Sequence, residues 1–497
     1  MPNTIERARG WKLRLTTLLL PPAGLVMLWL DSSHLAKKFL GTLGILLYSI
    51  PYSLLILWLL LQFTNLQLEW RGGFPPVPTY SKTLPNYDAV ERHRAAQASP
   101  NVVAPASKAQ PAYWTDFRGP QRNGHYDELL VITNWPAAGL RELWRQPIGG
   151  GYASFVIAEG LAFTIEQRRN EEVVTAYDLQ TGREIWTNGW PANFQESMGG
   201  DGPRATPTYH EGKIYALGAE GELRCLEAAT GRRVWSKNIL ADNDAVNIAY
   251  GMAASPLIVD DKVIVQPGGL SGKSVVAYNK TNGEPVWKSL SDSAAYSSPM
   301  LVNLAGERQL LIITETRAVG LEVETGKLLW EHPWVVKLNN RNIAQPVIFS
   351  TNRFFLSAGY GTGCEAVEVS KSGLKYSART IWQNKFLKNK FTSSIFYNGY
   401  IYGLDEDILT CLDAATGARQ WKDGRYGYGQ ILLANGHLIV LSGEGDLALV
   451  RAIPERHEEV ARFSAIHGKT WNYPAIAHGK LLVRNAVEMA CFDLLEK

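Results

Sequence analysis

The chain has 497 residues, of which 46% are hydrophobic and 20% charged, and its formal net charge at pH 7 is +3. With 16 Trp and 45 Gly, this composition is that of a folded protein with many turns and not of a disordered chain. No basic run with interleaved aromatic residues occurs, which argues against nucleic acid as a partner. The cysteines are widely separated, without a CxxC pair or a Cys/His cluster, so we predict no metal site.

Residues 1–71 are predicted to form a membrane anchor. The stretch 40–63 contains no charged residue and is long enough to cross a hydrocarbon core of about 30 Å. An earlier apolar run, 15–30, is shorter and contains Pro21-Pro22, so a second span and a re-entrant segment are both open. Two apolar runs separated by a charged loop favour a retained anchor over a cleaved signal peptide.

The basic residues near the span predict its orientation. Only Arg71 closely follows the span, and the others precede it. Because positive flanks stay in the cytoplasm, we expect the large domain on the periplasmic side of a bacterial-type inner membrane. If both apolar runs cross, the rule becomes ambiguous. The preceding basic residues are Arg7, Arg9, Lys12, Arg14, Lys37 and Lys38.

Residues 72–112 have a different composition from the segments on either side. They combine scattered proline with many Ala and Ser residues and low hydrophobicity. Such a composition favours a semi-extended linker over a packed core. We therefore predict a Pro/Ala-rich linker that holds the following domain, residues 113–497, away from the membrane.

From residue 140 onward one pattern recurs: an acidic residue or Asn, then a Gly, then a Trp four residues after the Gly. Short β-like runs flank each copy, so the Thr-Gly or Asn-Gly step is predicted to be a hairpin turn. The copies are Asp178/Gly182/Trp186, Glu227/Gly231/Trp235, Asn279/Gly283/Trp287, Glu322/Gly326/Trp330 and Asp413/Gly417/Trp421.

Two more short β-like runs precede each hairpin, which gives four strands per unit at a period of about 40–50 residues, typical of an all-β propeller. We predict eight blades, with seven as the alternative. The last unit stops three strands in, and residues 140–149 are predicted to supply its fourth strand and close the ring. The predicted first strands start near Ser154, Thr206, Ser255, Ser298, Gln345, Ser393, Gln430 and Tyr473.

Together with the segment WTDFRGPQRNG at 114–124, these repeats resemble the pyrroloquinoline-quinone-type propeller repeat proteins. That broad family includes quinoprotein alcohol dehydrogenases and the propeller lipoprotein of the outer-membrane β-barrel assembly machine. The resemblance covers about 113–497 and is specific for the fold. It implies that the repeated Trp docks between neighbouring blades, which assigns this structural role to Trp186, Trp235, Trp287, Trp330, Trp382 and Trp421.

The first strand of each propeller blade lines the axis, so the loops that enter these strands meet at one end of the channel. Here the loops are rich in aromatic, amide and charged residues, which suit a flat or anionic ligand. Turn residues that fill a wet channel are the simpler interpretation. The candidate binding residues are Tyr152, Glu196, Arg204, Asn247, Tyr250, Tyr296, Asn342, Lys390, Tyr428 and Trp471.

Two functions follow from this organisation. The first is a membrane-anchored, extracytoplasmic module that binds a protein partner or a small ligand at a propeller face, in envelope protein assembly. The alternative is a quinoprotein oxidoreductase, for which the resemblance implies pyrroloquinoline quinone and a calcium ion at the axis. Glu196, Asp201 and Asn247 lie in suitable loops, but there is no adjacent Cys-Cys pair. Because no catalytic motif occurs, we predict no catalytic residue and favour the first function.

Overall fold

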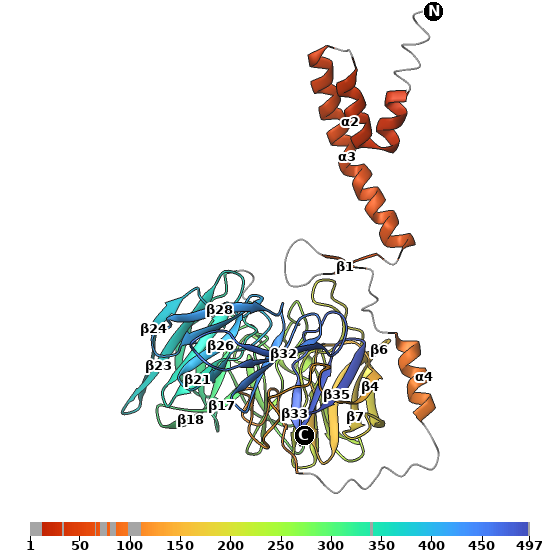
Figure 1. Ribbon diagram of the computed structural model, residues 1–497. Coiled ribbons are helices and arrows are strands. Elements are labelled where there is room, and N and C mark those ends of the chain that lie inside the picture. Colours follow the sequence, from red (N-terminus) through yellow and green to blue (C-terminus); the bar gives the residue numbers. More distant parts are fainter. Residues whose placement is uncertain are drawn as a thin grey trace, which may run out of the picture. The chain divides into compact units, whose positions relative to one another are not determined.

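The computed structural model describes residues 12–31, 34–64, 66–69, 77–79, 86–97, 111–337 and 341–495 (Figure 1). The chain forms two compact units, Met1–Lys82 and Thr83–Lys497. The first is mainly helical and the second is mainly β.

The N-terminal unit contains two helices that pack side by side, α2 (Pro21–Leu30) and α3 (Leu35–Phe63). Residues 12–19 are also helical, but Leu20 leaves the helical region because a proline follows it. The apolar run 15–30 is therefore two short helical pieces. The indole nitrogen of Trp29 donates to Thr42 at 3.0 Å, which links α2 to α3. Two short strands, β1 (Gln67–Glu69) and β2 (Val77–Thr79), pair with each other.

Helix α3 contains the predicted span 40–63. It has 29 residues, and among the described residues it is the helix that is long and apolar enough to cross a membrane. At 1.5 Å per residue this length exceeds the hydrocarbon thickness of about 30 Å. By length and composition α3 therefore fits a membrane span.

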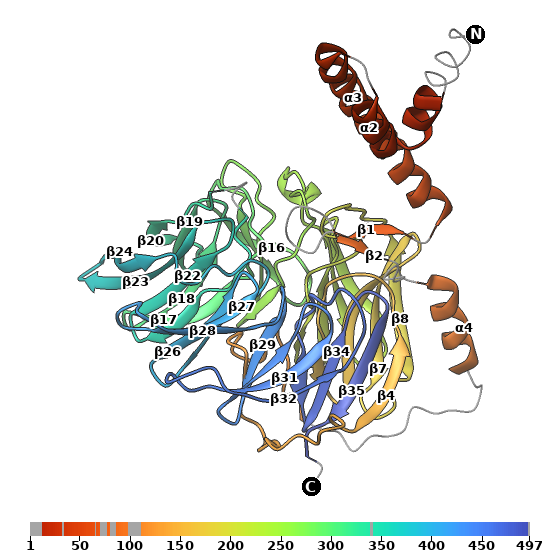
Figure 2. The ribbon, with the colours of Figure 1, turned by 45° about the horizontal axis from the view of Figure 1, so that its top comes forward.

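The second unit is an eight-bladed propeller, as predicted, and the seven-bladed alternative is wrong (Figure 2). Each first strand begins at its predicted residue or two residues later. First strands of neighbouring blades contact one another and so lie innermost. Blade 1 is β5 (Val156–Ala158), β6 (Leu161–Arg168), β7 (Glu171–Asp178) and β8 (Glu184–Pro191); blade 2 is β9 (Thr208–His210), β10 (Lys213–Leu217), β11 (Glu222–Glu227) and β12 (Arg233–Asn238); blade 3 is β13 (Leu257–Val259), β14 (Lys262–Val265), β15 (Val275–Asn279) and β16 (Pro285–Ser289); blade 4 is β17 (Met300–Leu304), β18 (Glu307–Ile313), β19 (Arg317–Glu322) and β20 (Leu328–Pro333).

The last four blades carry the irregular features. The inserted residues of blade 5 lengthen its outer hairpin, and β3 (His125–Tyr126) adds a parallel strand to blade 7. The predicted closing strand is confirmed, since β4 (Glu142–Pro147) pairs with β35 of blade 8. Blade 5 is β21 (Val347–Ser350), β22 (Arg353–Ala358), β23 (Gly363–Ser372) and β24 (Lys375–Asn384); blade 6 is β25 (Ile395–Tyr397), β26 (Tyr400–Asp405), β27 (Ile408–Asp413) and β28 (Arg419–Arg425); blade 7 is β29 (Gln430–Ala434), β30 (His437–Leu441), β31 (Asp446–Arg451) and β32 (Glu459–Ser464); blade 8 is β33 (Ala475–Ala477), β34 (Lys480–Arg484), β35 (Glu488–Asp493) and β4.

The repeated Trp and Gly residues meet between blades. The indole nitrogen of Trp186 donates to the carbonyl of Ala228 in the next blade at 2.8 Å. Gly231 of that blade's turn lies over the indole ring, where a Cβ would come within 2.4 Å of it. The turn glycine therefore provides both the positive φ and the space for the neighbouring Trp. The same indole-to-carbonyl bond to the next blade is made by Trp144, Trp235, Trp287, Trp382 and Trp421.

Trp330 departs from this arrangement because the lengthened hairpin of blade 5 has no glycine in that place. Its indole nitrogen donates instead to Gln309 of its own blade at 2.6 Å, and its ring packs against Phe354. Trp144 on the closing strand follows the common arrangement, although it was not among the predicted interblade residues. It was missed because its strand is far in sequence from the rest of its blade.

A small residue lies directly across the strand from each Trp. Cys225 pairs with Trp235 and Cys411 with Trp421, while Ala occupies this place in other blades. All four cysteines are buried and free, and burial raises the pKa of their thiols. These cysteines therefore act as small apolar residues.

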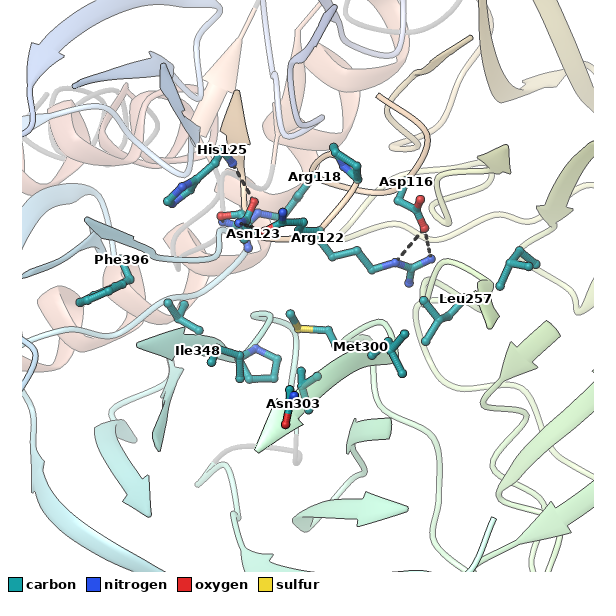
Figure 3. A pocket seen from close by; sticks show the side chains of 17 residues that line it. Asp116, Arg118, Arg122, Asn123, His125, Leu257, Met300, Asn303, Ile348 and Phe396 are labelled. Carbon is teal, nitrogen blue, oxygen red and sulfur yellow. Dashed lines mark hydrogen bonds and ion pairs between the residues drawn. The ribbon is translucent and has the colours of Figure 1, made fainter. Parts of the chain in front are cut away.

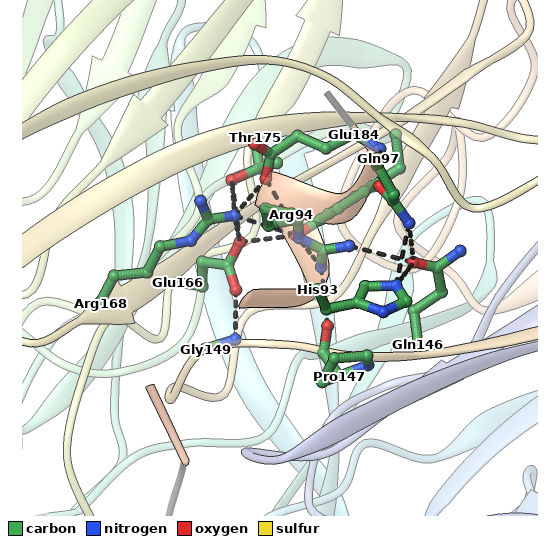
Figure 4. Close-up of polar contacts among 11 residues, drawn as sticks. His93, Arg94, Gln97, Gln146, Pro147, Gly149, Glu166, Arg168, Thr175 and Glu184 are labelled. Atoms are coloured by element: carbon green, nitrogen blue, oxygen red, sulfur yellow. Dashed lines mark hydrogen bonds and ion pairs between the residues drawn. The ribbon is translucent and has the colours of Figure 1, made fainter. Parts of the chain in front are cut away.

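A helix lies within the range predicted as an extended linker, and that part of the prediction is wrong. Helix α4 (Tyr87–Gln97) packs on the propeller, where Arg94 donates to the carbonyl of Pro147 at 2.7 Å and pairs with Glu184 at 3.3 Å (Figure 4). The guanidinium of Arg94 also lies 4.9 Å from the centre of the Tyr177 ring. Side chains of blade 1 and the closing strand of blade 8 thus bind a segment whose composition is that of a linker. Residues 98–110 lie outside the described residues.

Candidate functional site

The channel of the propeller has two ends. We call the end where the loops enter the first strands the entry mouth, and the opposite end, crossed by residues 114–124, the plug mouth. Arginine residues lie at both ends, but they contact aromatic rings at one end and backbone carbonyls at the other. The entry mouth gathers most of the predicted binding residues.

Four cations and six aromatic rings surround the entry mouth. They form a series in space, in which each side chain contacts the next. The Arg341 guanidinium lies 4.6 Å from the ring centre of Tyr250 and 5.6 Å from that of Tyr360. Lys390 follows, 5.0 Å from the Tyr360 ring and 4.8 Å from that of Tyr428. Such distances are those of cation–π contacts. The two cations therefore bridge three aromatic rings drawn from different blades.

The other half of the set has the same alternation. Phe391 stacks on Trp471 with ring centres 4.5 Å apart, and Lys469 lies 4.4 Å from the Trp471 ring. Lys469 also lies 5.4 Å from Tyr152, whose ring is 5.5 Å from the Arg204 guanidinium. We call the whole set the cation–aromatic ring; it consists of Tyr152, Arg204, Tyr250, Arg341, Tyr360, Lys390, Phe391, Tyr428, Lys469 and Trp471.

Carboxylates also lie near this mouth. Glu196 accepts hydrogen bonds from the backbone N–H groups of Met198 and Gly199, and Glu406 lies 3.8 Å from Lys390. Burial lowers the pKa of Lys390 and raises that of Tyr428 to about 12, so at pH 7 the phenol is neutral. The mouth therefore presents positive charge between aromatic surfaces.

The structure separates the predicted binding residues into two groups. Tyr152, Arg204, Tyr250, Lys390, Tyr428 and Trp471 belong to the cation–aromatic ring. Tyr296 packs against Tyr250 with ring centres 5.9 Å apart. Glu196 lies beside this set, because its carboxylate holds the backbone of the loop that reaches Tyr152 and Tyr250.

The two asparagines hold loops in place. The amide of Asn247 donates to the carbonyl of Ala219 at 2.9 Å. That of Asn342 is buried and donates to the carbonyls of Thr314 and Glu315, both at 3.0 Å. The Nδ2 of Asn342 is therefore engaged by the loop, while its Oδ1 has no hydrogen-bond partner among the described residues.

Four members of the ring were not predicted: Arg341, Tyr360, Phe391 and Lys469. Three of them lie in entry loops next to predicted residues, so their charge or aromatic character was a usable signal. Tyr360 comes instead from the loop between β22 and β23. Only the three-dimensional arrangement shows that this loop reaches the same mouth.

The calcium ligands that the resemblance implies do not fit this site. Asp201 accepts the backbone N–H of Glu196 at 2.9 Å, and the Glu196 carboxylate accepts backbone N–H groups, whereas the Oδ1 of Asn247 has no hydrogen-bond partner among the described residues. Within the described ranges no three His, Cys, Asp or Glu side chains are grouped to hold a metal ion. Arg204 lies beside Glu196 and repels a divalent cation. The donor set at the entry mouth suits an anion better than calcium.

The plug mouth is closed by the segment 114–124, whose arginines bind backbone carbonyls. Arg122 donates to the carbonyls of Ser255 at 3.2 Å and Pro299 at 2.9 Å, and it pairs with Asp116 at 3.0 Å. The backbone of Trp114 forms a bridge to Ile157 of blade 1. The segment therefore ties blades 1, 3 and 4 together across the axis.

Comparison with known proteins agrees with this architecture. The family described as "Outer membrane protein assembly factor BamB" matches residues 169–423, which is about half of the chain. The chain belongs to this family. The BamB of Burkholderia pseudomallei is 20% identical over 362 residues, which cover 62% of this chain and 87% of that protein. The crystal structure of BamB from Moraxella catarrhalis has 15% identity and a TM-score of 0.52, and covers 72% of this chain and 98% of that one.

Beyond the BamB family, the chain also matches quinoprotein dehydrogenases. A 1-butanol dehydrogenase (cytochrome c) of Thauera butanivorans is 26% identical over 173 residues, or 34% of this chain and 24% of that protein. A quinohemoprotein alcohol dehydrogenase of Pseudomonas putida is 25% identical over 192 residues, 37% of this chain and 26% of that one. The matched part thus spans about a quarter of each dehydrogenase.

Proposed function

We propose that the protein is a membrane-anchored, extracytoplasmic propeller that binds a protein partner in cell-envelope protein assembly. Membership of the BamB family supports an assembly role, and the match extends over most of the Burkholderia pseudomallei protein. In this proposal α3 crosses the inner membrane and the propeller lies in the periplasm. The basic residues before α3 support that orientation.

The observation that carries the proposal is the cation–aromatic ring. Tyr, Trp and Arg are the residue types that most often anchor protein interfaces, and here they are gathered at one mouth. Four cations lie between these aromatic rings, so a partner segment with acidic and aromatic side chains complements the surface. A tether to the membrane also raises the local concentration of the module near membrane-bound partners.

Site-specific photocrosslinking in cells tests the binding surface. With p-benzoylphenylalanine in place of Tyr428, we expect a crosslinked adduct with an envelope protein, and Arg341→Glu should remove that adduct by reversing a neighbouring charge. Position Glu284 is the control, since its side chain is 65% exposed and pairs with Lys237 away from the mouth. Equal crosslinking from both positions, or adducts that persist in the Arg341→Glu variant, would contradict the proposal.

Cysteine labelling tests the location. All four native cysteines are buried, whereas Leu374 at the tip of the long hairpin of blade 5 is 96% exposed. In the Leu374→Cys variant, a membrane-impermeant maleimide should label the chain in spheroplasts with an intact inner membrane. Labelling only after lysis would place the propeller in the cytoplasm.

The oxidoreductase alternative is supported by the partial matches to quinoprotein dehydrogenases. The donor set described above does not favour it. After incubation of the full chain with pyrroloquinoline quinone and calcium, we expect no dye-linked oxidation of ethanol or 1-butanol. Turnover that requires both additions would replace the assembly role by an enzymatic one.

A further inference from the structure

A cavity of about 610 Å³ lies at the plug mouth, at the opposite end of the channel from the cation–aromatic ring (Figure 3). Residues of the plug segment form one wall, and the first strands of blades 3–6 form the other. Its volume is in the range of small-molecule sites, about 300–1,000 Å³. The cavity is thus separate from the surface proposed to bind a partner.

The plug wall carries an uncompensated positive charge. Arg118 lines the cavity and is only 1% exposed. Its Nη2 donates to the carbonyl of Ser394 at 2.9 Å, and its guanidinium lies 5.5 Å from the Tyr473 ring. Among the residues that the structure describes, its Nε and Nη1 have no hydrogen-bond partner. A buried charge with unpaired donors costs several kcal/mol, which a bound anion would offset.

The other charges on this wall cancel. Arg122 is paired with Asp116 at 3.0 Å, so the two contribute no net charge. Burial and the nearby Arg118 lower the pKa of His125, which is therefore neutral at pH 7. The wall keeps the single positive charge of Arg118. A ligand with one negative charge balances it, whereas a dianion leaves an excess.

The opposite wall is largely apolar, although it includes Asn303. Met300, Val347 and Phe396 line it together with Ile348. Met300 and Val347 are buried, and Ile348 and Phe396 are partly exposed toward the cavity side of their strands. A ligand body that covers these side chains gains about 25 cal/mol for each Å² of apolar surface removed from water.

We propose that this cavity binds a monoanionic carboxylate with a short apolar chain or ring, the carboxylate at Arg118 and the apolar body against blades 4–6. Charge-assisted N–H···O bonds to a guanidinium are among the stronger hydrogen bonds in proteins. The site depends on the plug segment and not on the cation–aromatic ring. The test of this cavity therefore does not depend on whether the proposed partner binding is correct.

Saturation-transfer NMR on the full chain in lipid nanodiscs tests the site, with hexanoate as the probe and empty nanodiscs as the blank. Hexanol carries the apolar body alone and inorganic phosphate the anion alone. We expect saturation of the hexanoate signals, no comparable effect on hexanol, and no displacement of hexanoate by equimolar phosphate. Equal saturation of hexanol, or displacement by phosphate, would overturn the proposed ligand class.

Three variants locate the site. Arg118→Gln removes the charge and should weaken hexanoate binding at least about ten-fold. Leu301 lines the cavity and is 38% exposed, so Leu301→Trp should block the cavity without disturbing the core. The control is Arg308→Gln, since Arg308 forms an exposed pair with Asp260. If Arg118→Gln fails to fold, Leu301→Trp decides: hexanoate binding that survives this variant contradicts the proposal.

Discussion

The two mouths of the channel hold the same kind of charge in opposite ways. At the entry mouth, Arg341 and Lys469 are partly exposed and lie against aromatic rings. At the plug mouth, Arg118 and Arg122 are fully buried and donate to backbone carbonyls of the residues just before first strands. One mouth holds its cations against aromatic rings, and the other uses them to close the ring of blades.

This difference separates what the charges do. An aromatic ring that loses its cation keeps its own packing, so the entry mouth tolerates substitution. A buried carbonyl or carboxylate that loses its guanidinium is left without a partner, which costs far more than the bond contributes. We therefore expect substitutions at the plug mouth to affect stability and those at the entry mouth to affect binding.

The largest expected effect is that of Arg122→Gln. The substitution leaves Asp116 and the carbonyls of Ser255 and Pro299 without their donor, and we expect a loss of about 3–5 kcal/mol in the free energy of unfolding. The matched change at the other mouth, Arg341→Gln, removes the cation–π contacts with Tyr250 and Tyr360 and should cost about 1 kcal/mol or less. Urea unfolding followed by tryptophan fluorescence measures both. Equal losses would remove the distinction between the mouths.

The next largest effect is a pH dependence at the entry-mouth end of blade 1. Glu172 is fully buried, and its carboxylate accepts one hydrogen bond, from the backbone N–H of Ala219 at 2.9 Å. Burial raises its pKa from 4.5 to about 7. Because the folded state then binds the proton more tightly than the unfolded state, stability falls as the pH rises from about 4.5 to 7, by about 3 kcal/mol.

Glu172→Gln should remove this slope, with the exposed Glu284→Gln as the control. The measurement is the thermal midpoint of each variant at pH 5 and at pH 8. A wild-type slope that survives in Glu172→Gln would assign it to another group.

A smaller pH dependence of opposite sign is expected at the plug mouth. Burial, with Arg118 nearby, lowers the pKa of His125 below 6.5. The unfolded state then binds the proton more tightly, so stability falls as the pH drops below 6.5. Because Glu172 titrates over the same range with the opposite sign, the test is made in the Glu172→Gln background, where adding His125→Asn should remove the loss of stability below pH 6.5. A profile changed on its alkaline side would contradict this assignment.

The sequence predicts the framework of the fold because the framework is repeated. The Gly and Trp of each turn recur at fixed spacing, and the family resemblance implies that the Trp docks between blades. The structure adds that the Trp of one blade meets the turn Gly of the next, as Trp186 meets Gly231. Trp144 could not be anticipated, since its strand reaches blade 8 from the other end of the domain. Trp330 also escapes the pattern, because an insertion in the next blade removes its glycine.

The residues at the two mouths can be predicted only in part from the sequence, because the sequence repeat does not include them. Their residues do not repeat, and contacts such as that of Tyr360 with Lys390 join loops of different blades. Residue type alone does not distinguish Asn342, whose Nδ2 donates to backbone carbonyls, from a ligand-binding asparagine. Likewise, nothing in the composition of 72–112 indicates that α4 finds polar partners on blade 1.

The smallest expected change in stability is that of Lys390→Met at the entry mouth. Methionine keeps an unbranched chain against Tyr360 and Tyr428, and the lost pairing with Glu406, at 3.8 Å, is weak. Since burial already lowers the pKa of Lys390, removing its charge also relieves a desolvation cost. We expect the free energy of unfolding to change by no more than about 1 kcal/mol.

The same variant should nevertheless weaken crosslinking from position 428 several-fold, because one of the ring's four cations is gone. Thermal unfolding and the crosslink yield are measured on the same preparation. A loss of stability as large as that of Arg122→Gln would show that the cation–aromatic ring is a structural closure like the plug. An unchanged yield at unchanged stability would remove Lys390 from the binding surface and leave Arg341 as the cation to test next.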